Sequence, residues 1–374
     1  MKKSSSVFVA GGTGMVGSAI IRALQSKGYN RIIANYHRRQ PKSEAVEWHP
    51  LELTDQKAVA DFFRSRTPDY VFLAAARVGG IGANNQYRAD FLYDNLQIQN
   101  NVVHSSFHAG VKKLLFLGSS CIYPRDCPQP IKEEYLLTGP LEYTNEPYAT
   151  AKIAGMKLCE SFNLQRGSNF VSVMPTNLYG PEDNFDLEAS HVLPALIRKF
   201  HLAKLAGQGD FKAIDQDEKI LGPIPETMRK DLDLESASPR PLVRLWGTGK
   251  PRREFLHVDD LAEACLFIME KADFEDLAEL RRKETETNVK ELHNLRNCHV
   301  NIGCGTDESI KKVAERVQSI VGFQGRVVWD DSMPDGTPRK LLEVSRMESF
   351  GWHPRIDLHE GIQSVYTWYL NHSG

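Results

Sequence analysis

The stretch Ser119-Ser120-Cys121-Ile122-Tyr123-Pro124 places a hydroxyl and a thiol two residues apart, directly after an apolar run at 114–118. The run predicts a fully buried strand of a parallel sheet. In open parallel sheets, ligands lie just beyond the carboxyl ends of the strands, so we expect the hexapeptide to line a site. If the strand continues, Ser119 and Cys121 point to the same side. A serine alone would hold a substrate hydroxyl, whereas the added thiol indicates a reaction.

A second reactive pair is Tyr148 and Lys152, which follow Pro147. Proline suits the start of a helix, so the two side chains should share one helix face. A free tyrosine, with a pKa of about 10, is a poor acid–base group at neutral pH, and a nearby ammonium lowers that pKa. The lysine can also hold the nicotinamide ribose. Tyr-x-x-x-Lys is common as a surface pair, but the strand-end serine and the glycine turn described below favour a catalytic pair.

His191 opens a further helical segment at 191–200. A histidine near a helix start can simply pack against its neighbours. Beside a cleft, however, histidine is the usual group for proton transfer near neutral pH. We therefore keep His191 as a candidate acid.

The first element that must position these groups is a strand at 6–10, which runs into Gly11, Gly14 and Gly17 and then a helix that ends near Gly28. Strand, glycines and helix in this order predict a dinucleotide site, because the glycines allow a tight turn and the helix N-terminus meets the pyrophosphate. The alternative is a plain glycine turn, which this context disfavours.

The second strand, 31–36, ends in His37-Arg38-Arg39. A cofactor without a ribose phosphate would favour Asp or Glu here. Two guanidinium groups suit a 2′-phosphate instead, through forked charge-assisted hydrogen bonds. We therefore predict NADP(H) rather than NAD, with a solvated basic turn as the alternative.

Further strands are expected at 46–53, 69–76, 114–118 and 170–175, with helices between them, including a long one over 83–108. Thr54 or Asp55 would cap the helix near 59–63. This βα alternation predicts an α/β fold, a Rossmann-type doubly wound parallel sheet with helices on both faces.

The remaining strands and helices expected from the sequence do not continue the βα alternation, and they predict a smaller C-terminal substrate lobe. We expect an NADP-binding Rossmann domain over 1–178, with segments near 253–303 returning to it, and a substrate-binding lobe from 179–252 and 304–374. Two polar stretches, 207–241 and 273–297, carry no chemical motif. They are interpreted as surface decoration, the first as an excursion and the second as a charged helix extension.

The composition is that of an ordinary globular protein. The 374 residues carry a formal net charge of −2, 41% are hydrophobic and 25% are charged, which gives no reason to expect nucleic acid or an anionic membrane as partner. No signal peptide or membrane-spanning run is visible. The six cysteines lack CxxC or metal-ligand spacing, so we expect free thiols in a reducing cytoplasm and no metal site.

Taken together, the glycine turn, the strand-end serine and Tyr-x-x-x-Lys resemble the extended short-chain dehydrogenase/reductase family. Within it the chain resembles the GDP-L-fucose synthases, which are 3,5-epimerases and 4-reductases of GDP-4-keto-6-deoxy-D-mannose. The resemblance covers nearly the whole chain apart from the two polar stretches. The segments that carry it are 117–124, 145–148, 175–181, 183–185, 253–260 and 334–340.

The resemblance implies a role for each reactive residue. Cys121 would be the base and His191 the acid that invert C3 and C5, whose hydrogens the C4 keto group acidifies. A cationic neighbour or the cofactor would favour the thiolate of Cys121. NADPH would then deliver hydride to C4 while Tyr148 supplies the proton. Ser119 would bond the keto oxygen or the phenol, and Lys152 would tune Tyr148 and hold the ribose.

The resemblance also implies binding residues and partners. The substrate, a GDP-sugar, would contact Lys199, Trp246, Arg253 and Asp335. The cofactor would contact Gly11, Gly14, Met15, Val16, Gly17, Arg38, Ala75, Gly118, Lys152, Pro175, Asn177, Leu178 and His191. Family members typically form homodimers through the helices at 83–108 and 147–166.

Two alternatives stay open. The first is a 4-keto reductase, with or without epimerase activity, acting on a related GDP-deoxysugar or GDP-deoxyheptose. The second is an NADP-binding regulatory protein that has lost turnover, which the intact Ser119, Tyr148 and Lys152 disfavour.

Overall fold

A seven-stranded parallel sheet forms the centre of the computed structural model, which describes residues 1–37, 41, 43–284, 295–333 and 335–373. The strand order is β11-β6-β5-β4-β1-β2-β3. The strands are β1 (Val7–Ala10), β2 (Ile32–Tyr36), β3 (Glu47–Pro50), β4 (Tyr70–Leu73), β5 (Lys113–Leu117), β6 (Phe170–Pro175) and β11 (Val300–Ile302). The order reverses between β1 and β4, and at such a switch point a crevice opens for a ligand. The predicted doubly wound α/β fold is confirmed.

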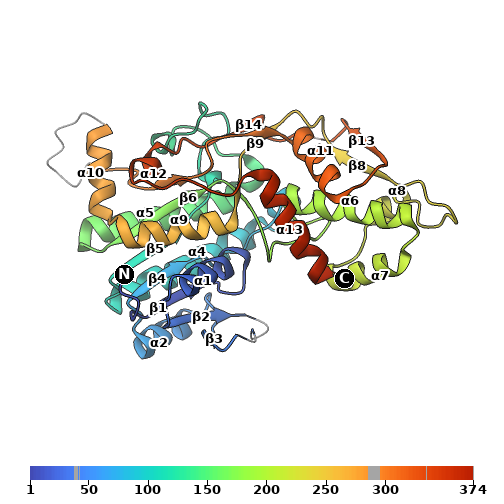
Figure 1. The fold of residues 1–374 in the computed structure, drawn as a ribbon. Coiled ribbons are helices and arrows are strands. Elements are labelled where there is room, and N and C mark those ends of the chain that lie inside the picture. Colours follow the sequence, from blue (N-terminus) through green and yellow to red (C-terminus); the bar gives the residue numbers. More distant parts are fainter. Residues whose placement is uncertain (38–40, 42, 285–294, 334, 374) are drawn as a thin grey trace.

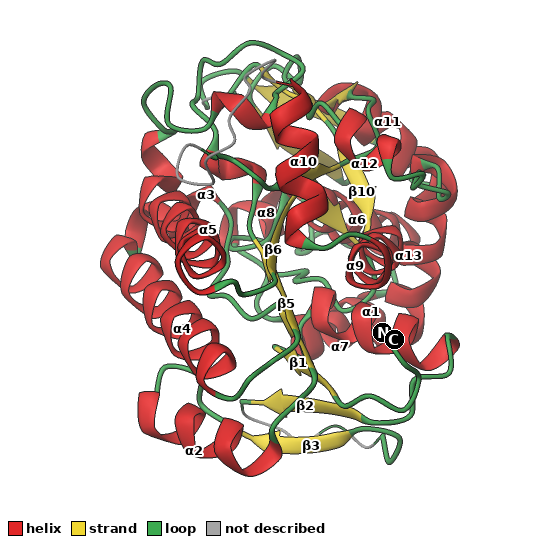
Figure 2. Cartoon of the chain, turned by 90° about the vertical axis from the view of Figure 1, so that its left-hand side faces the viewer, coloured by secondary structure: helices red, strands yellow, loops and turns green. Residues whose placement is uncertain are grey.

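Helices cover both faces of this sheet (Figure 2). On one side lie α2 (Gln56–Arg66), α4 (Arg88–His108) and α5 (Glu146–Arg166), and on the other α1 (Met15–Ser26) and α9 (Val258–Lys271). Side chains alternate along β1, so that Val7 and Val9 join the core beneath α1 and α9 while Phe8 joins the core beneath α2 and α4. The burial of each such side chain contributes about 1.5–3 kcal/mol.

The structure decides one local prediction and corrects another. Asp55 rather than Thr54 caps α2, because its carboxylate accepts the N–H of Ala58. The prediction of a single helix over 83–108 is wrong, because α3 (Ile81–Gln86) ends before Tyr87 and α4 begins after it. Tyr87 has φ −108° and ψ 43°, outside the helical region, and this breaks the hydrogen-bond ladder.

The C-terminal half builds a second layer of small sheets and helices, seen at the right of Figure 1. Three small sheets pair β7 (Asn177–Tyr179) with β10 (Phe255–His257), β8 (Leu242–Trp246) with β13 (Arg326–Asp330), and β9 (Arg252–Arg253) with both β12 (Glu308–Ser309) and β14 (Arg339–Lys340). The main helices are α6 (Val192–Gln208), α11 (Ile310–Val321) and α13 (Leu358–Ser373), and the short α12 (Ser345–Ser349) lies against β11. This half has its own core, which includes Ile197, Phe200, Val317 and Tyr369.

The stretch 207–241 is part of that second core, which differs from the surface excursion expected from its polarity. It forms α7 (Phe211–Leu221) and α8 (Glu226–Asp231), and its Ile214, Ile224 and Leu232 are buried. Asp217 of α7 pairs with the fully buried Arg198 of α6, with 2.8 Å between Oδ1 and Nε. The many charged residues of this stretch concealed an apolar stripe, because periodicity rather than average composition decides which face of a helix is buried.

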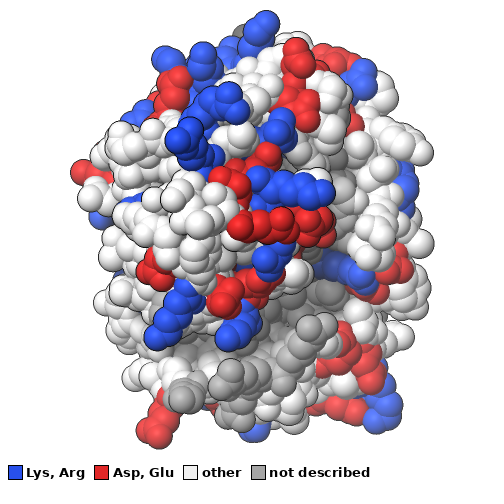
Figure 3. Space-filling view, turned by 90° about the vertical axis from the view of Figure 1, so that its right-hand side faces the viewer, with Lys and Arg blue, Asp and Glu red and all other residues white. Residues whose placement is uncertain are grey.

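The second polar stretch begins as the predicted helix. α10 (Phe274–Glu284) buries Phe274 and Leu277 and carries surface ion pairs such as Arg282–Glu275; residues 285–294 lie outside the described part of the chain. At the opposite end of the molecule, the right-hand side of Figure 1, acidic and basic side chains are also interspersed (Figure 3). Within the described residues, no helix has the length and apolar character to span a bilayer.

Candidate active site

A one-turn 3₁₀ helix, η1 (Ser120–Ile122), follows β5 and carries the reactive hexapeptide. Ser119 caps it, because its Oγ accepts the N–H of Cys121 at 3.2 Å. The strand therefore does not continue through Cys121, and the expectation based on strand alternation is wrong. The chain turns at Ser119, whose hydroxyl oxygen is joined by this local hydrogen bond to the backbone of Cys121.

Tyr148 and Lys152 lie one turn apart at the start of α5, as predicted. Tyr148 shares a hydrogen bond with Ser119, and the Lys152 ammonium donates to the carbonyl oxygen of Leu117 at 2.7 Å. The Lys152 Nζ is 5.8 Å from the centre of the Tyr148 ring. Both side chains are thereby tied to the end of β5.

The electrostatics of this pair differ from the expectation. Burial raises the pKa of Tyr148, the neighbouring Cys121 adds to the rise, and the Ser119 hydrogen bond opposes it. Burial also lowers the pKa of Lys152 to about 7. Desolvation thus outweighs the influence of the lysine, because a low-dielectric site disfavours both charged forms. Tyr148 is held as the neutral phenol, which can donate a proton.

Two residues that sequence reasoning did not assign to the site contact the thiol. The Asn145 amide Nδ2 lies 3.4 Å from the Cys121 Sγ, and the Lys340 ammonium Nζ lies 3.5 Å from it. Arg253 is close enough for the charge of Cys121 to raise its pKa, although burial has the larger, opposite effect. The expected cationic neighbour is therefore Lys340, which lies 219 positions further along the chain. The only signal for it was its place in the resembling segment 334–340.

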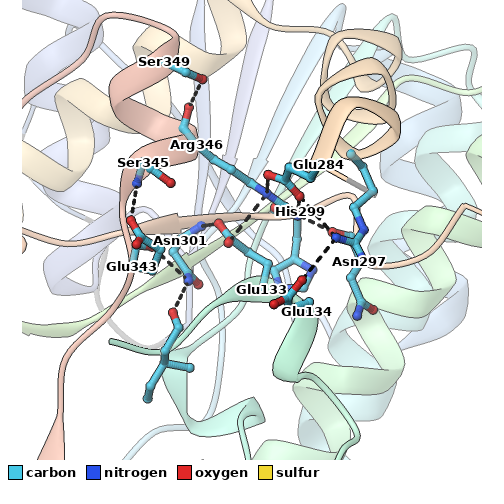
Figure 4. Close-up of polar contacts among 12 residues, drawn as sticks. Glu133, Glu134, Glu284, Asn297, His299, Asn301, Glu343, Ser345, Arg346 and Ser349 are labelled. Atoms are coloured by element: carbon cyan, nitrogen blue, oxygen red, sulfur yellow. Dashed lines mark hydrogen bonds and ion pairs between the residues drawn. The ribbon is translucent and has the colours of Figure 1, made fainter. Parts of the chain in front are cut away.

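A buried polar network holds the segment that follows the thiol, and Figure 4 shows the part of it around Glu133, Asn301 and Arg346. The Tyr123 hydroxyl lies 2.9 Å from His299 Nε2 and donates to Asn301 Oδ1 at 2.5 Å. In η2 (Glu133–Tyr135), Glu133 accepts the Asn301 N–H at 3.0 Å, and burial raises the pKa of Glu133 to about 7. Arg346 of α12 donates to the His299 carbonyl oxygen at 2.7 Å. The chain after Cys121 is thus fixed to β11.

His191 lies on a different segment of the chain from the thiol and the phenol. It is the residue before α6, and its side chain is exposed and makes no hydrogen bond within the described part of the chain. Burial nonetheless lowers its pKa, a combination expected on the wall of a cleft. The Gly80 N–H donates to the Ala189 carbonyl oxygen at 2.9 Å, so the loop after β4 holds the loop before α6.

The glycine turn has the geometry of a phosphate cradle. Gly11 has φ +88°, and a Cβ on Gly17 would lie 2.0 Å from the Gly11 oxygen, so both positions require glycine. A Cβ on Gly14 would meet only that oxygen, at 3.6 Å, which leaves this side of the turn open. α1 begins at Met15 with no side-chain cap and no acid in its first turn, so its N–H groups are available to an anion. These features fit a dinucleotide.

The other predicted cofactor residues follow the carboxyl ends of neighbouring strands. Ala75 follows β4, Gly118 follows β5, and Pro175 ends β6. Asn177 and Leu178 open β7, and the Asn177 amide donates to the Glu254 carbonyl oxygen at 2.8 Å. Val16 follows Met15 in α1. Arg38 lies outside the described residues, as does Arg39.

The predicted substrate residues gather mainly around one loop. Asp335 accepts hydrogen bonds from the Thr248 N–H at 2.6 Å and its hydroxyl at 2.8 Å, beside Trp246, whose side chain is 65% exposed. The next residue, Gly336, faces Arg253, since a Cβ there would lie 3.6 Å from the guanidinium. Lys199 stands on α6, and burial lowers its pKa.

The family model described as the NAD dependent epimerase/dehydratase family matches residues 7–279. The chain belongs to this family. It is 48% identical over 371 residues to a putative GDP-L-fucose synthase of Arabidopsis thaliana, covering 99% of this chain and 93% of that one. It is 46% identical over 364 residues to the GDP-L-fucose synthase of Escherichia coli K12, covering 97% and 96%. The resemblance to the GDP-L-fucose synthases that the sequence predicted is therefore confirmed.

A solved structure extends the comparison. A GDP-D-glycero-L-gluco-heptose synthase from Campylobacter jejuni, determined in the presence of NADPH, superimposes with a TM-score of 0.84. It is 42% identical, and the match covers 99% of each chain. Because the match is full length, the family likeness extends through the second core as well as the large sheet.

Proposed function

We propose that this chain is an NADPH-dependent enzyme that epimerises C3 and C5 and then reduces C4 of GDP-4-keto-6-deoxy-D-mannose, giving GDP-L-fucose. The observation that carries the proposal is the turn at η1. There a thiol in contact with an ammonium, Cys121 with Lys340, adjoins the Ser119–Tyr148–Lys152 set. The identities of 46–48% to GDP-L-fucose synthases support the same reaction.

Epimerisation needs a base on one face of the sugar and an acid on the other. The Cys121 thiolate, stabilised by the ammonium of Lys340, removes the proton that the C4 keto group has acidified. His191, from the loop before α6, returns a proton to the opposite face. Asn145 donates to the sulfur and so helps to orient it.

Reduction uses the neighbouring hydroxyl groups. NADPH, when bound, supplies hydride for C4 of the ketone. Tyr148 donates the proton to the new C4 hydroxyl, and its raised pKa keeps the phenol protonated for that task. Ser119 bonds the phenol and can also bond the keto oxygen. Lys152 holds the end of β5 beside them.

The cofactor would be held by the glycine turn, with its pyrophosphate at the N-terminus of α1. Lys152 and Asn177 would hold the nicotinamide half, and Arg38 the 2′-phosphate. On the substrate side, Lys199 and Arg253 would meet the diphosphate, while Trp246 offers an apolar face and Asp335 closes the loop beside it.

We assign residues 1–178, with segments near 253–303, to the NADP-binding domain, and 179–252 with 304–374 to the substrate lobe. The first has the two cores of the large sheet and the second a core of its own.

We also infer a homodimer formed through α4 and α5, supported by Tyr93, which is 62% exposed on α4. Light scattering tests the dimer. The six free thiols support a reducing compartment such as the cytoplasm.

A 4-keto reductase of a GDP-deoxyheptose is the second candidate, favoured by the 42% identity to the heptose synthase. Product analysis by NMR separates the two. Purified enzyme with NADPH and GDP-4-keto-6-deoxymannose should give GDP-L-fucose, and in heavy water the product should carry deuterium at C3 and C5. Turnover without label at either carbon would contradict the epimerase half. Turnover only with the heptose substrate would favour the second candidate.

A further inference from the structure

Glu254 is a fully buried carboxylate that no step above uses. Its Oε1 accepts the backbone N–H groups of Cys304 and Gly305, each at 2.7 Å, and its Oε2 accepts that of Leu342 at 3.0 Å. Burial raises the pKa of Glu254, and these N–H groups oppose the rise. A buried carboxylate is costly unless it is well hydrogen-bonded, so the three bonds tie two distant loops to this one side chain.

One of these loops leads to the thiol. Leu342 lies two residues after Lys340, in the segment that continues β14. The Glu254 N–H also donates to the Lys340 carbonyl oxygen at 3.3 Å, so Glu254 binds the chain on both sides of Leu341. β14 runs parallel to β9, whose Arg253 directly precedes Glu254. The position of the Lys340 ammonium at Cys121 thus depends on a strand that Glu254 anchors.

We propose that Glu254 is a positioning residue for the epimerase half-reaction: it fixes β14 so that the Lys340 ammonium stays at the Cys121 sulfur. The inference rests on the proposed role of Cys121 as the base. Glu254 acts through the backbone of residues 340–342 and through Lys340, because its carboxylate accepts three backbone N–H groups and a side-chain hydrogen bond from Thr176.

Glu254→Gln tests this with almost no change in volume. The amide oxygen can still accept the N–H groups of Cys304 and Gly305, but the amide NH₂ then faces the Leu342 N–H, donor against donor. We expect β14 to loosen. Among the described residues, the titratable groups that the structure places near Cys121 are the cations Lys340 and Arg253 and the neutral Tyr148 phenol, and of these only Lys340 is carried by β14.

The primary readout is alkylation of Cys121 by iodoacetamide, followed by peptide mass spectrometry across a pH series. Alkylation at pH 7 should fall severalfold, because an ammonium held beside the sulfur favours the reactive thiolate. Deuterium exchange at C3 and C5, measured without NADPH, should fall by a similar factor. NADPH binding, followed by fluorescence, should be unchanged.

Asp260→Asn is the matched control. Asp260 is another buried carboxylate, and its Oδ2 accepts the N–H groups of Arg355 and Ile356 at 3.0 and 2.9 Å, a loop that does not contact Cys121. Its alkylation profile should match the wild type, even if its melting temperature falls. If Glu254→Gln does not fold, Gly303→Ala replaces it. A Cβ at Gly303 would lie 2.3 Å from Glu254 Oε1 and would displace the carboxylate.

A double-mutant cycle with Lys340→Met completes the test. If Glu254 acts through Lys340, Glu254→Gln should add nothing to the alkylation shift of Lys340→Met. An additive effect, or an unchanged profile in folded Glu254→Gln, would overturn the inference while leaving the proposed function intact. If Cys121→Ser exchanges deuterium as fast as the wild type, the proposed role of Cys121 as the base fails instead, and the alkylation profiles still decide the link between Glu254 and Lys340.

Discussion

The two halves of the candidate active site are built in different ways. The proposed reductase groups come from two adjoining elements: Ser119 follows strand β5, and Tyr148 and Lys152 lie at the start of helix α5. Hydrogen bonds tie these groups to the end of β5. The proposed epimerase groups, Cys121, Lys340 and His191, come from three segments far apart in the sequence. The first set is fixed by the local fold of the large sheet. The second depends on how the C-terminal loop and the loop before α6 pack against the rest of the fold.

This difference implies that the two half-reactions can be damaged separately. Variants that loosen the substrate lobe should affect proton exchange first. Variants at the end of β5 and the start of α5 should affect hydride transfer first. The predictions below test that separation, beginning with the largest effect.

Tyr148→Phe should lower NADPH oxidation by about 10²- to 10⁴-fold, the usual range for loss of a general acid. Exchange at C3 and C5 should remain, because the phenol acts only in the reduction. Absorbance at 340 nm reports the first activity and NMR in heavy water the second. Loss of both activities in a folded variant that still binds NADPH would break the separation.

Cys121→Ser should lower exchange at C3 and C5 by about 10²-fold or more, because a serine hydroxyl is a far weaker acid than a thiol and forms little anion at neutral pH. NADPH binding should be unaffected. Cys127→Ser is the matched control, since Cys127 is half-buried nearby and burial raises its pKa. Wild-type exchange in Cys121→Ser would remove the thiol from the mechanism.

The two activities should also respond differently to pH. Lys152, with a pKa lowered to about 7, loses its ammonium charge as pH rises through that value. Reduction should therefore fall above pH 7, as the positive charge beside the cofactor and the phenol is lost, whereas exchange does not use Lys152 and should not follow this titration. Parallel profiles, measured at saturating NADPH for reduction and without NADPH for exchange, would contradict the distinct electrostatics of the two sets.

Trp246→Ala should produce the smallest effect and should not separate the activities. The exposed indole offers an apolar face to the nucleotide, and its loss should cost about 0.5–1.5 kcal/mol of binding, a rise in KM of about two- to tenfold. Both reactions should change equally because they share one bound sugar. Trp246→Phe should recover most of the affinity, and a change in only one activity would move Trp246 into the chemistry.

The sequence by itself determined the large sheet and the residues that belong to it. Buried strands and glycine spacing are local signals, and the strand-end serine and Tyr-x-x-x-Lys follow from the order of the elements. The sequence also proposed Cys121 and His191 as candidates through the resemblance. It was wrong about the direction of the chain at Cys121, because a one-turn helix begins where a strand was extrapolated.

Only the tertiary structure decided what surrounds the thiol. Lys340 reaches Cys121 across 219 positions, and Glu254 holds the strand that carries it. The polar stretch 207–241, which the sequence did not predict to pack, forms two packed helices in the structure. Spacing in a sequence constrains groups that share an element or adjoining elements, whereas a contact between distant loops depends on how the two cores pack together. That packing places an ammonium beside the thiol.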